Sequence, residues 1–235
     1  MKYSKLPRVY IKEEINTNSL IEIQSELYDY IINVLRAKKN FQLRVFNEKN
    51  GEFFAEVKIE GKNCRLLIKE KFEKPPILGR KITLISSLIR PEKFELICDM
   101  ATQMGIYRII PLITERVQQF RAPNYTRLKK IIEESVRQSE RLDFPILEEA
   151  KTFEQIDLAG YTQILFANEN EKNTEHKIGN LGENIAIIVG PEGGFTEIEV
   201  KKILLLDNVA SLSLGSYVLR SETAAIALLA RLMLL

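Results

Sequence analysis

A glycine-rich loop near the end of the chain has the residue types of a ligand-binding turn. Its sequence, GPEGGF, spans residues 190–195 and follows the apolar run at residues 185–189. Glycines let the backbone come close to a ligand, and free amides at a helix start can donate hydrogen bonds to that ligand. Thr196 and Glu199 have the spacing of a capping box, so a helix should begin there. A tight strand-to-helix turn without a ligand explains the same pattern.

A second loop, at residues 214–225, places charged side chains between an apolar loop and an apolar helix. It reads LGSYVLRSETAA, so Arg220 and Glu222 stand two residues apart. A fixed guanidinium can stabilise negative charge that develops during a reaction, and a carboxylate can accept a proton. In the alternative without a site, Glu222 is a favourable acid in the first turn of a helix and Arg220 is its surface partner.

The middle of the chain holds a basic stretch with interleaved aromatic residues, a composition that fits an RNA-binding surface. Its members are Arg116, Phe120, Arg121, Tyr125, Arg127, Lys129, Lys130, Arg137 and Arg141. The alternative is a solvated helix face that is balanced by Glu133, Glu134 and Glu140. The formal net charge of +2 does not decide between the two. His176 lies in a polar run and is expected in a loop, without a catalytic role.

Both loops need elements that hold them, and residues 75–235 alternate between strand-like and helix-like patterns. Strands are expected at residues 82–89, 107–112, 164–167, 185–189 and 211–214, and helices at residues 93–104, 124–139, 196–206 and 221–235. This alternation indicates an α/β domain with a mostly parallel sheet. Both glycine segments would then follow the carboxyl end of a strand.

Residues 1–74 predict a smaller, β-rich domain. The expected elements are strands at residues 41–46, 53–59 and 64–68, a hairpin turn at residues 47–51 and one helix at residues 25–36. Lys74-Pro75-Pro76 marks a break, because paired prolines disfavour a helix before them and lack N–H donors. We therefore expect two domains, residues 1–74 and residues 75–235.

The composition is that of a folded globular protein, since 45% of the residues are hydrophobic and 28% are charged. The N-terminus lacks the uninterrupted apolar stretch of a signal peptide, and no apolar run is long enough to span a bilayer. We therefore expect a cytoplasmic protein with no membrane partner. Cys64 and Cys98 do not have the spacing of a zinc or redox site, so we expect reduced cysteines and no bound metal.

Taken together, the two glycine segments resemble the paired signature of the SPOUT methyltransferases. The similarity is greatest to the RsmE-type family, which methylates N3 of a uridine in small-subunit 16S ribosomal RNA. Further motifs that resemble this family are residues 111–116 (PLITER), residues 138–141 (QSER) before Pro145, and residues 34–36 (VLR). Asp29 and Tyr30 stand where the family usually has histidines.

This resemblance implies a fold and an assembly. Residues 75–235 would form a SPOUT domain, which is a Rossmann-like, mostly parallel sheet with a deep trefoil knot. Residues 1–74 would form a small PUA-like β-barrel that binds RNA. The family also implies a homodimer, and 16S ribosomal RNA within the assembled small ribosomal subunit as the partner.

The resemblance further implies S-adenosyl-L-methionine as the cofactor. The residues that match the family's cofactor site are Leu165, Phe166, Ala167, Gly190, Pro191, Glu192, Gly193, Gly194, Leu214, Gly215, Val218, Leu219, Thr223 and Ala224. Arg220 is the expected catalytic cation, because uridine N3 is protonated at neutral pH and a cation would favour the uracil anion. Glu222 is expected either to accept the proton or to orient Arg220. The expected RNA contacts are Arg8, Arg36, Arg116, Arg121 and Arg141.

Three other interpretations stay open from the sequence. The chain could be a SPOUT methyltransferase that acts on another RNA or base, or a non-catalytic RNA-binding homologue. It could also be a nucleotide-phosphate enzyme that uses residues 190–194 as a phosphate loop. The last is disfavoured, because the loop lacks the Gly-Lys-Ser/Thr ending of a P-loop.

Overall fold

The computed structural model describes residues 6–61, 63–73, 79–117, 122–171 and 181–233. The chain folds as two units: unit 1 comprises Met1–Ile77 and Val136–Asp143, and unit 2 comprises Leu78–Ser135 and Phe144–Leu235. The boundary expected after residue 74 falls within residues 74–78, which lie outside the described part. Val136–Asp143 groups with unit 1, although unit 2 has already begun before it in the chain.

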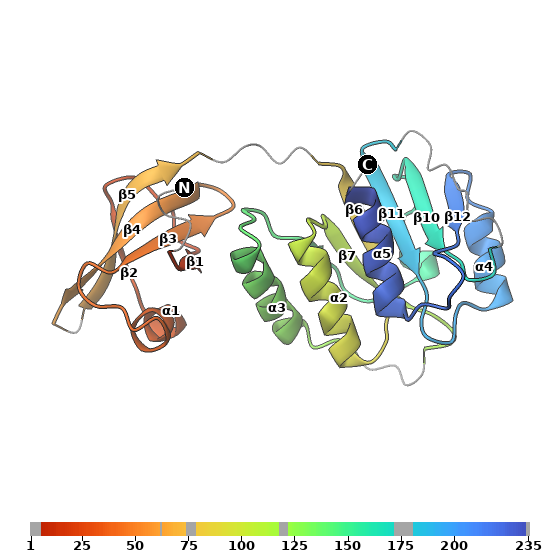
Figure 1. Ribbon diagram of the computed structural model, residues 1–235, viewed down its shortest axis with the longest axis horizontal. Coiled ribbons are helices and arrows are strands. Elements are labelled where there is room, and N and C mark those ends of the chain that lie inside the picture. Colours follow the sequence, from red (N-terminus) through yellow and green to blue (C-terminus); the bar gives the residue numbers. More distant parts are fainter. Residues whose placement is uncertain (1–5, 62, 74–78, 118–121, 172–180, 234–235) are drawn as a thin grey trace. The chain divides into compact units, whose positions relative to one another are not determined.

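Unit 1 is built on a five-stranded sheet with the order β1-β3-β4-β5-β2 (Figure 1). The strands are β1 Arg8–Tyr10, β2 Leu20–Glu22, β3 Gln42–Asn47, β4 Gly51–Glu60 and β5 Asn63–Phe72. β1 pairs with β3 in parallel, and the other pairs are antiparallel. The expected β-rich domain is confirmed. Its closure into a barrel stays a prediction, because the end strands β1 and β2 do not pair within the described residues.

The predicted hairpin is also confirmed, since β3 and β4 pair in register as far as Asn47 and Gly51. The Asn47 side chain shapes the turn: its Oδ1 accepts the backbone N–H of Lys49 at 3.1 Å and that of Asn50 at 2.7 Å. Local hydrogen bonds of this kind explain why asparagine favours turns. The hairpin contributes Val45, Ala55 and other apolar side chains to the core of unit 1.

The helix expected at residues 25–36 is shorter and changes its pitch. α1 spans Ser25–Asp29 and continues as a π-helical turn at Tyr30–Val34. Ile31 is fully buried in the core of unit 1, and the Leu35 N–H donates to the Tyr30 carbonyl oxygen at 2.9 Å. The wider turn seats Ile31 in the core and ends the helix before Arg36, whose φ is +53°.

Unit 2 contains a seven-stranded sheet in which every described pair of strands is parallel. Its order is β12-β10-β11-β6-β7-β8, with β9 also paired to β7. Figure 1 labels β12, β10, β11, β6 and β7 of this sheet. The strands are β6 Lys81–Ser87, β7 Arg108–Ile113, β8 Ile146–Leu147, β9 Lys151–Thr152, β10 Gln163–Ala167, β11 Asn184–Val189 and β12 Val209–Leu212. The predicted α/β class is confirmed. The strands β8 and β9 were not expected, because two residues are too few to show a period.

The helices of unit 2 are α2 Pro91–Gln103, α3 Tyr125–Gln138, α4 Glu197–Leu204 and α5 Ser221–Met233, with the last turn of α3 counted in unit 1. In Figure 1, α2 and α5 are in front of the sheet, and α4 packs beside β12. Ile203 of α4 joins Phe166 and Ile188 in an apolar cluster. α5 contacts β10 and β11, whereas α4 contacts β12.

After its last strand, the chain turns back over the sheet. β12 lies on the far side of β10 from β11, yet α5 contacts both β11 and α2. The loop between β12 and α5 therefore passes the carboxyl ends of β10 and β11. This path is compatible with the trefoil knot that the family resemblance implies, and the knot itself stays a prediction.

Within the part of the chain that is described, no helix is long and apolar enough to cross a bilayer, and no cluster of His, Cys, Asp and Glu is arranged to hold a metal ion. Cys64 and Cys98 are free thiols and both are buried. Burial raises the pKa of Cys98 to about 12. The two cysteines are therefore packing groups rather than reactive thiols.

Candidate functional site

A pocket of about 170 Å³ lies at the carboxyl ends of β10, β11 and β12. Ligands of open parallel sheets bind outside these strand ends. Three segments form most of its wall: residues 166–170, residues 189–195 apart from Gly193, and residues 212–219. Both glycine segments that the sequence singles out therefore meet in one pocket.

The loop after β11 is shaped by a tight turn and a capped helix. The Gly194 N–H donates to the Pro191 carbonyl oxygen at 2.9 Å, and Gly194 has a φ of +67°, which glycine adopts without strain. Thr196 caps α4: its Oγ1 accepts the Glu199 N–H at 3.3 Å, and its own N–H donates to Glu199 Oε2 at 2.8 Å. The predicted capping box is confirmed and sets where the loop ends.

Close packing explains why residue 190 is a glycine. A Cβ on Gly190 would lie 2.8 Å from the Phe195 ring. Phe195 packs edge-on against Phe166 with a centroid distance of 5.5 Å, and both rings line the pocket. Gly190 therefore leaves room for the aromatic wall.

A hydrogen bond joins the two glycine segments, because Ser221 Oγ donates to the Gly190 carbonyl oxygen at 2.7 Å. In the second segment, Gly215 has a φ of +119° and an added Cβ would meet open space, so backbone conformation rather than crowding requires glycine there. Tyr217 and Val218 are 86% and 82% exposed. The rim of the pocket thus presents apolar side chains to solvent.

Most of the residues expected at the cofactor line this pocket: Phe166, Ala167, Gly190, Pro191, Glu192, Gly194, Leu214, Gly215, Val218, Leu219 and Ala224. Leu165, Gly193 and Thr223 do not line it. Leu165 is fully buried, and alternation along β10 turns its side chain to the opposite face from Phe166. Sequence reasoning missed the polar lining residues Asn168, Glu169 and Asn170, although polar residues directly after an apolar strand were a usable signal.

The charged residues that line the pocket are both acidic, Glu169 and Glu192. A Cβ on Gly194 would come within 3.2 Å of Glu169 Oε1, so the glycine lets this carboxylate lie beside the loop. A phosphate would be repelled by two carboxylates and would find no lysine or arginine among the lining residues that the structure describes. A ligand with a positive charge would be attracted.

Arg220 and Glu222 flank Ser221 at the start of α5. Arg220 is exposed, and among the described residues it forms no ion pair. Its carbonyl oxygen accepts the Ala224 N–H at 2.8 Å, as the residue before a helix should. Glu222 is buried, and its Oε1 lies 3.2 Å from Lys93 Nζ on α2. The ion-pair partner of Glu222 is therefore Lys93 and not Arg220.

The pKa of Glu222 lies below its ordinary value. Burial by itself would raise the pKa, but the hydrogen bond from its own backbone N–H, the Lys93 ammonium and the charge of Arg220 together lower it. Glu222 is therefore ionised at neutral pH and is a weak proton acceptor. The role of proton acceptor is therefore disfavoured. Because the carboxylate pairs with Lys93, the orientation of Arg220 by Glu222 stays a prediction.

Comparison with known proteins decides the family. Residues 77–233 match a family model described as an RNA methyltransferase domain. A Rickettsia conorii protein named ribosomal RNA small subunit methyltransferase E is 44% identical, over 100% of this chain and 97% of the relative. The chain belongs to the ribosomal RNA small subunit methyltransferase E family. The resemblance carried by the two glycine segments is thereby confirmed.

Solved structures share the fold of this methyltransferase E chain. A Legionella pneumophila methyltransferase in complex with the bound cofactor SAM is 28% identical, with a TM-score of 0.86 over 98% of each chain. Ribosomal RNA small subunit methyltransferase E from Neisseria gonorrhoeae, bound to S-adenosyl methionine, is 24% identical, with a TM-score of 0.82 over 96% of each chain. At its lower identity, the second comparison supports the fold alone.

In this member of the methyltransferase E family, Arg116 forms a hydrogen bond with the backbone of the first glycine segment. Its Nη1 donates to the Gly193 carbonyl oxygen at 3.0 Å. The preceding residue, Glu115, offers its backbone N–H to Glu199 Oε1 at 3.0 Å. The PLITER motif at residues 111–116 thus supports the loop from the end of β7. Arg116 was expected only at the RNA, because sequence reasoning did not pair this motif with the loop.

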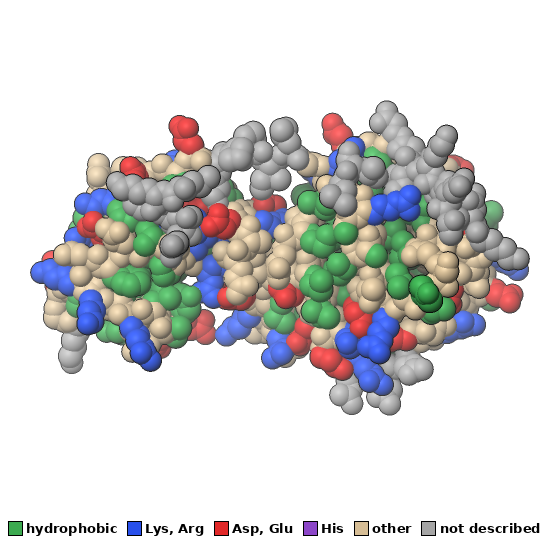
Figure 2. Space-filling model, viewed as in Figure 1, with side chains coloured by type: hydrophobic (Ala, Val, Ile, Leu, Met, Phe, Trp, Pro, Cys, Tyr) green, Lys and Arg blue, Asp and Glu red, His purple; other side chains and the backbone are tan. Residues whose placement is uncertain are grey.

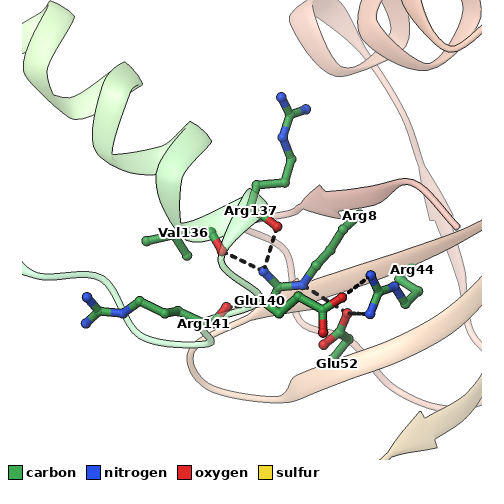
Figure 3. Close-up of polar contacts among 7 residues, drawn as sticks. All are labelled: Arg8, Arg44, Glu52, Val136, Arg137, Glu140 and Arg141. Atoms are coloured by element: carbon green, nitrogen blue, oxygen red, sulfur yellow. Dashed lines mark hydrogen bonds and ion pairs between the residues drawn. The ribbon is translucent and has the colours of Figure 1, made fainter. Parts of the chain in front are cut away.

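Arg8, also expected at the RNA, is only 5% exposed in unit 1. Its Nε donates to Glu52 Oε1 at 2.9 Å, and its Nη1 donates to the carbonyl oxygens of Val136 at 2.7 Å and Arg137 at 3.3 Å (Figure 3). These carbonyls end α3 and have no partner within the helix. The guanidinium also lies 3.5 Å from the centroid of the Phe46 ring. We therefore correct the expectation for Arg8 and assign it a structural role, because its donors are used inside the protein.

Further ion pairs hold the same segment in unit 1. Arg44 Nη1 lies 3.5 Å from Glu52 Oε1, and Arg44 Nη2 lies 2.5 Å from Glu140 Oε1. Arg141 was expected at the RNA, but its side chain is 9% exposed and pairs with Asp143 at 2.6 Å. The Arg44–Glu140 pair therefore joins the segment Val136–Asp143 to the sheet, while the Arg141–Asp143 pair lies within the segment.

Arg36 is the RNA candidate of unit 1 whose side chain is exposed, at the end of the π-helical turn. Arg121 and His176 lie outside the described residues. On the face shown in Figure 2, basic and acidic side chains are interspersed. The described side chains on that face form no surface of a single sign, so the assignment of RNA contacts rests on individual residues.

Proposed function

We propose that this chain is an S-adenosylmethionine-dependent methyltransferase that acts on N3 of a uridine in 16S ribosomal RNA of the small subunit. The observation that carries the proposal is the meeting of both glycine segments in one pocket, with Ser221 Oγ bonded to the Gly190 carbonyl oxygen. The Rickettsia relative is named a ribosomal RNA small subunit methyltransferase, and the Legionella structure contains the cofactor SAM.

The pocket suits S-adenosylmethionine chemically. This cofactor carries a sulfonium and an ammonium group, and the charged residues in the described part of the lining, Glu169 and Glu192, are carboxylates. The apolar residues Leu214, Val218 and Leu219 offer surface and backbone polar groups for an adenine ring. When bound, the cofactor supplies an electrophilic methyl carbon.

The chain contributes to the reaction by placing charged side chains near the reacting base. Uridine N3 carries a proton and is a weak nucleophile, so a uracil anion must be favoured. Arg220 is exposed beside the pocket and forms no ion pair among the described residues, so its guanidinium can stabilise negative charge on the uracil oxygens. Glu222, held ionised by Lys93, sets the electrostatics at the start of α5.

For the RNA, we propose that Arg36 of unit 1 and Arg121 contact the phosphate backbone. Arg116 and Arg141 are engaged in protein contacts, so any RNA contact that they make is additional to those. Phosphate contacts of this kind would give an affinity that falls steeply with salt. We also propose the assembled small ribosomal subunit as the substrate, and a cytoplasmic location where it is found.

We propose a homodimer as the active assembly. Exposed apolar residues on the helices of unit 2 offer surface for a second copy: Leu96 and Met100 on α2, Ile198 and Leu204 on α4, and Met233 on α5. Most of the apolar face of α5 is used within the chain, since Leu228, Leu229 and Leu232 are buried. Light scattering after size-exclusion chromatography measures the assembly directly.

The test of the reaction uses small ribosomal subunits from a strain that lacks this gene. The protein is incubated with labelled S-adenosylmethionine and either subunits or free 16S RNA, and modified bases are mapped. The proposal expects one methylated uridine at N3, with subunits preferred over free RNA. Methylation of another base or of transfer RNA would establish a different SPOUT substrate. Absence of cofactor binding in a calorimetric titration would establish a non-catalytic RNA-binding homologue.

A further inference from the structure

Lys93 stands at an unusual place for a lysine. It is in the first turn of α2, which begins at Pro91. The N-terminal end of a helix carries a partial positive charge, so a cation there is unfavourable by itself. Its ammonium lies 3.2 Å from Glu222 Oε1, and its side chain is 35% exposed. The pairing with Glu222 offsets the unfavourable position.

Glu222 brings a buried negative charge to the start of α5. Its side chain is 11% exposed, and its own backbone N–H and the Lys93 ammonium satisfy it. Arg220 is two residues away, and its charge also helps to lower the pKa of Glu222. It forms no ion pair among the residues that the structure describes. One carboxylate thus has two cations within its field, and it pairs with the one on α2.

We propose that Lys93 is a positioning residue for methyl transfer: it occupies the Glu222 carboxylate and so leaves the Arg220 guanidinium free for the RNA base. A buried carboxylate without a partner is unfavourable, so Glu222 would turn to Arg220 if Lys93 were neutral. The carboxylate would then occupy the Arg220 guanidinium and offset its positive charge, so Arg220 would stabilise negative charge on the uracil oxygens less well. The inference rests on the catalytic role proposed for Arg220.

Chemical modification tests the charge arrangement without any need for activity. Phenylglyoxal reacts with free guanidinium groups, and mass spectrometry measures the rate for each arginine peptide. In Lys93→Met, the rate at Arg220 should fall about fivefold, the factor that an ordinary ion pair supplies. The rate should return to the wild-type value in Lys93→Met/Glu222→Gln, and exposed Arg36 should react equally in all three proteins. An unchanged rate at Arg220 in Lys93→Met would overturn the proposal.

Kinetics on small ribosomal subunits test the consequence for turnover. Lys93→Met should lower kcat about tenfold with the KM for S-adenosylmethionine unchanged, because a transition-state charge is affected. Lys93→Arg, which keeps the charge, should restore kcat, and Lys93→Met/Glu222→Gln should recover most of it. The matched control is Lys202→Met on α4, which breaks the 2.7 Å pair between Lys202 and Glu154 and should turn over normally.

The outcomes separate this inference from the proposed function. Wild-type kcat in Lys93→Met, or a double variant that is slower than Lys93→Met, would overturn the positioning role while the methyltransferase assignment stands. A wild-type protein that methylates no RNA would overturn the assignment, and the phenylglyoxal rates would still decide whether Lys93 keeps Arg220 free. Thermal unfolding of each variant shows whether a lost rate reflects a lost fold. Lys93→Met could prove to be unfolded. In that case, a folded Lys93→Arg protein whose kcat stays well below the wild-type value would also overturn the role.

Discussion

The Ser221 hydroxyl donates a hydrogen bond of 2.7 Å to the carbonyl oxygen of Gly190. The two residues belong to different glycine segments, and each segment alone is explained by a strand-to-helix turn. Ser221 is 5% exposed, so water competes little for this bond. The contact makes the two turns into one wall of a pocket.

Ser221→Ala should therefore weaken cofactor binding without unfolding the protein. The loss of one hydrogen bond costs about 1 kcal/mol, so the dissociation constant for S-adenosylmethionine should rise about fivefold in calorimetry. Ser19→Ala is the control, because the Ser19 hydroxyl donates to a backbone carbonyl, that of Asn16, in unit 1. Equal affinities for Ser221→Ala and the wild type would show that the contact does not shape the site.

Gly190→Ala should disturb the aromatic wall of the pocket. Its Cβ would lie 2.8 Å from the Phe195 ring, which would have to move away from Phe166. Overpacking of this kind costs about 1–3 kcal/mol, and thermal unfolding together with cofactor titration measures it. Gly160→Ala is the matched control, because its Cβ would meet nothing within 4 Å. The crowding argument fails if both variants bind the cofactor as tightly as the wild type.

Glu169→Gln should reduce the preference of the pocket for a cationic ligand. We expect the affinity for S-adenosylmethionine to fall about two- to fivefold, as for other exposed charge pairs, and to fall less for the uncharged sulfur of S-adenosylhomocysteine. Glu183→Gln removes an exposed carboxylate that does not line the pocket and should change neither affinity. If the affinities for both ligands fall by the same factor, Glu169 contributes to the shape of the pocket rather than to its charge.

Arg220→Ala should leave cofactor binding largely intact and abolish methyl transfer. The side chain does not line the pocket, but loss of a cation at a developing anion typically lowers kcat about 100-fold or more. Single-turnover methylation of small subunits measures the rate, and calorimetry measures cofactor affinity. Wild-type turnover in this variant would end the catalytic assignment.

Arg8→Ala should destabilise unit 1 rather than merely weaken RNA binding. Removal of one partner from a buried ion pair costs about 3–5 kcal/mol, because Glu52 would keep a buried charge. Arg8→Ala/Glu52→Ala should recover part of that loss in urea unfolding. Arg127→Ala, which breaks an exposed pair with Glu95, should have little effect. A fully stable Arg8→Ala protein with reduced RNA affinity would instead support an RNA contact by Arg8, as expected from the sequence.

Local features could be predicted from the sequence because their causes lie within a few residues. The capping box of Thr196 and Glu199 and the turn at Asn47 depend on hydrogen bonds between near neighbours. The helices of unit 2, and its strands apart from the two-residue β8 and β9, follow from the periodicity of apolar residues. The family could be predicted as well, since both glycine segments are short, contiguous motifs.

The tertiary structure alone decided which charges face solvent and which are paired. Arg8 and Arg36 are both arginines in a domain expected to bind RNA, yet Arg8 is enclosed by Glu52, Val136 and Arg137 while Arg36 is exposed. Lys93 and Glu222 are far apart in the chain and meet because α2 packs against α5. The energy of a charge depends on its burial and on its partners in space, and folding brings these from distant parts of the sequence.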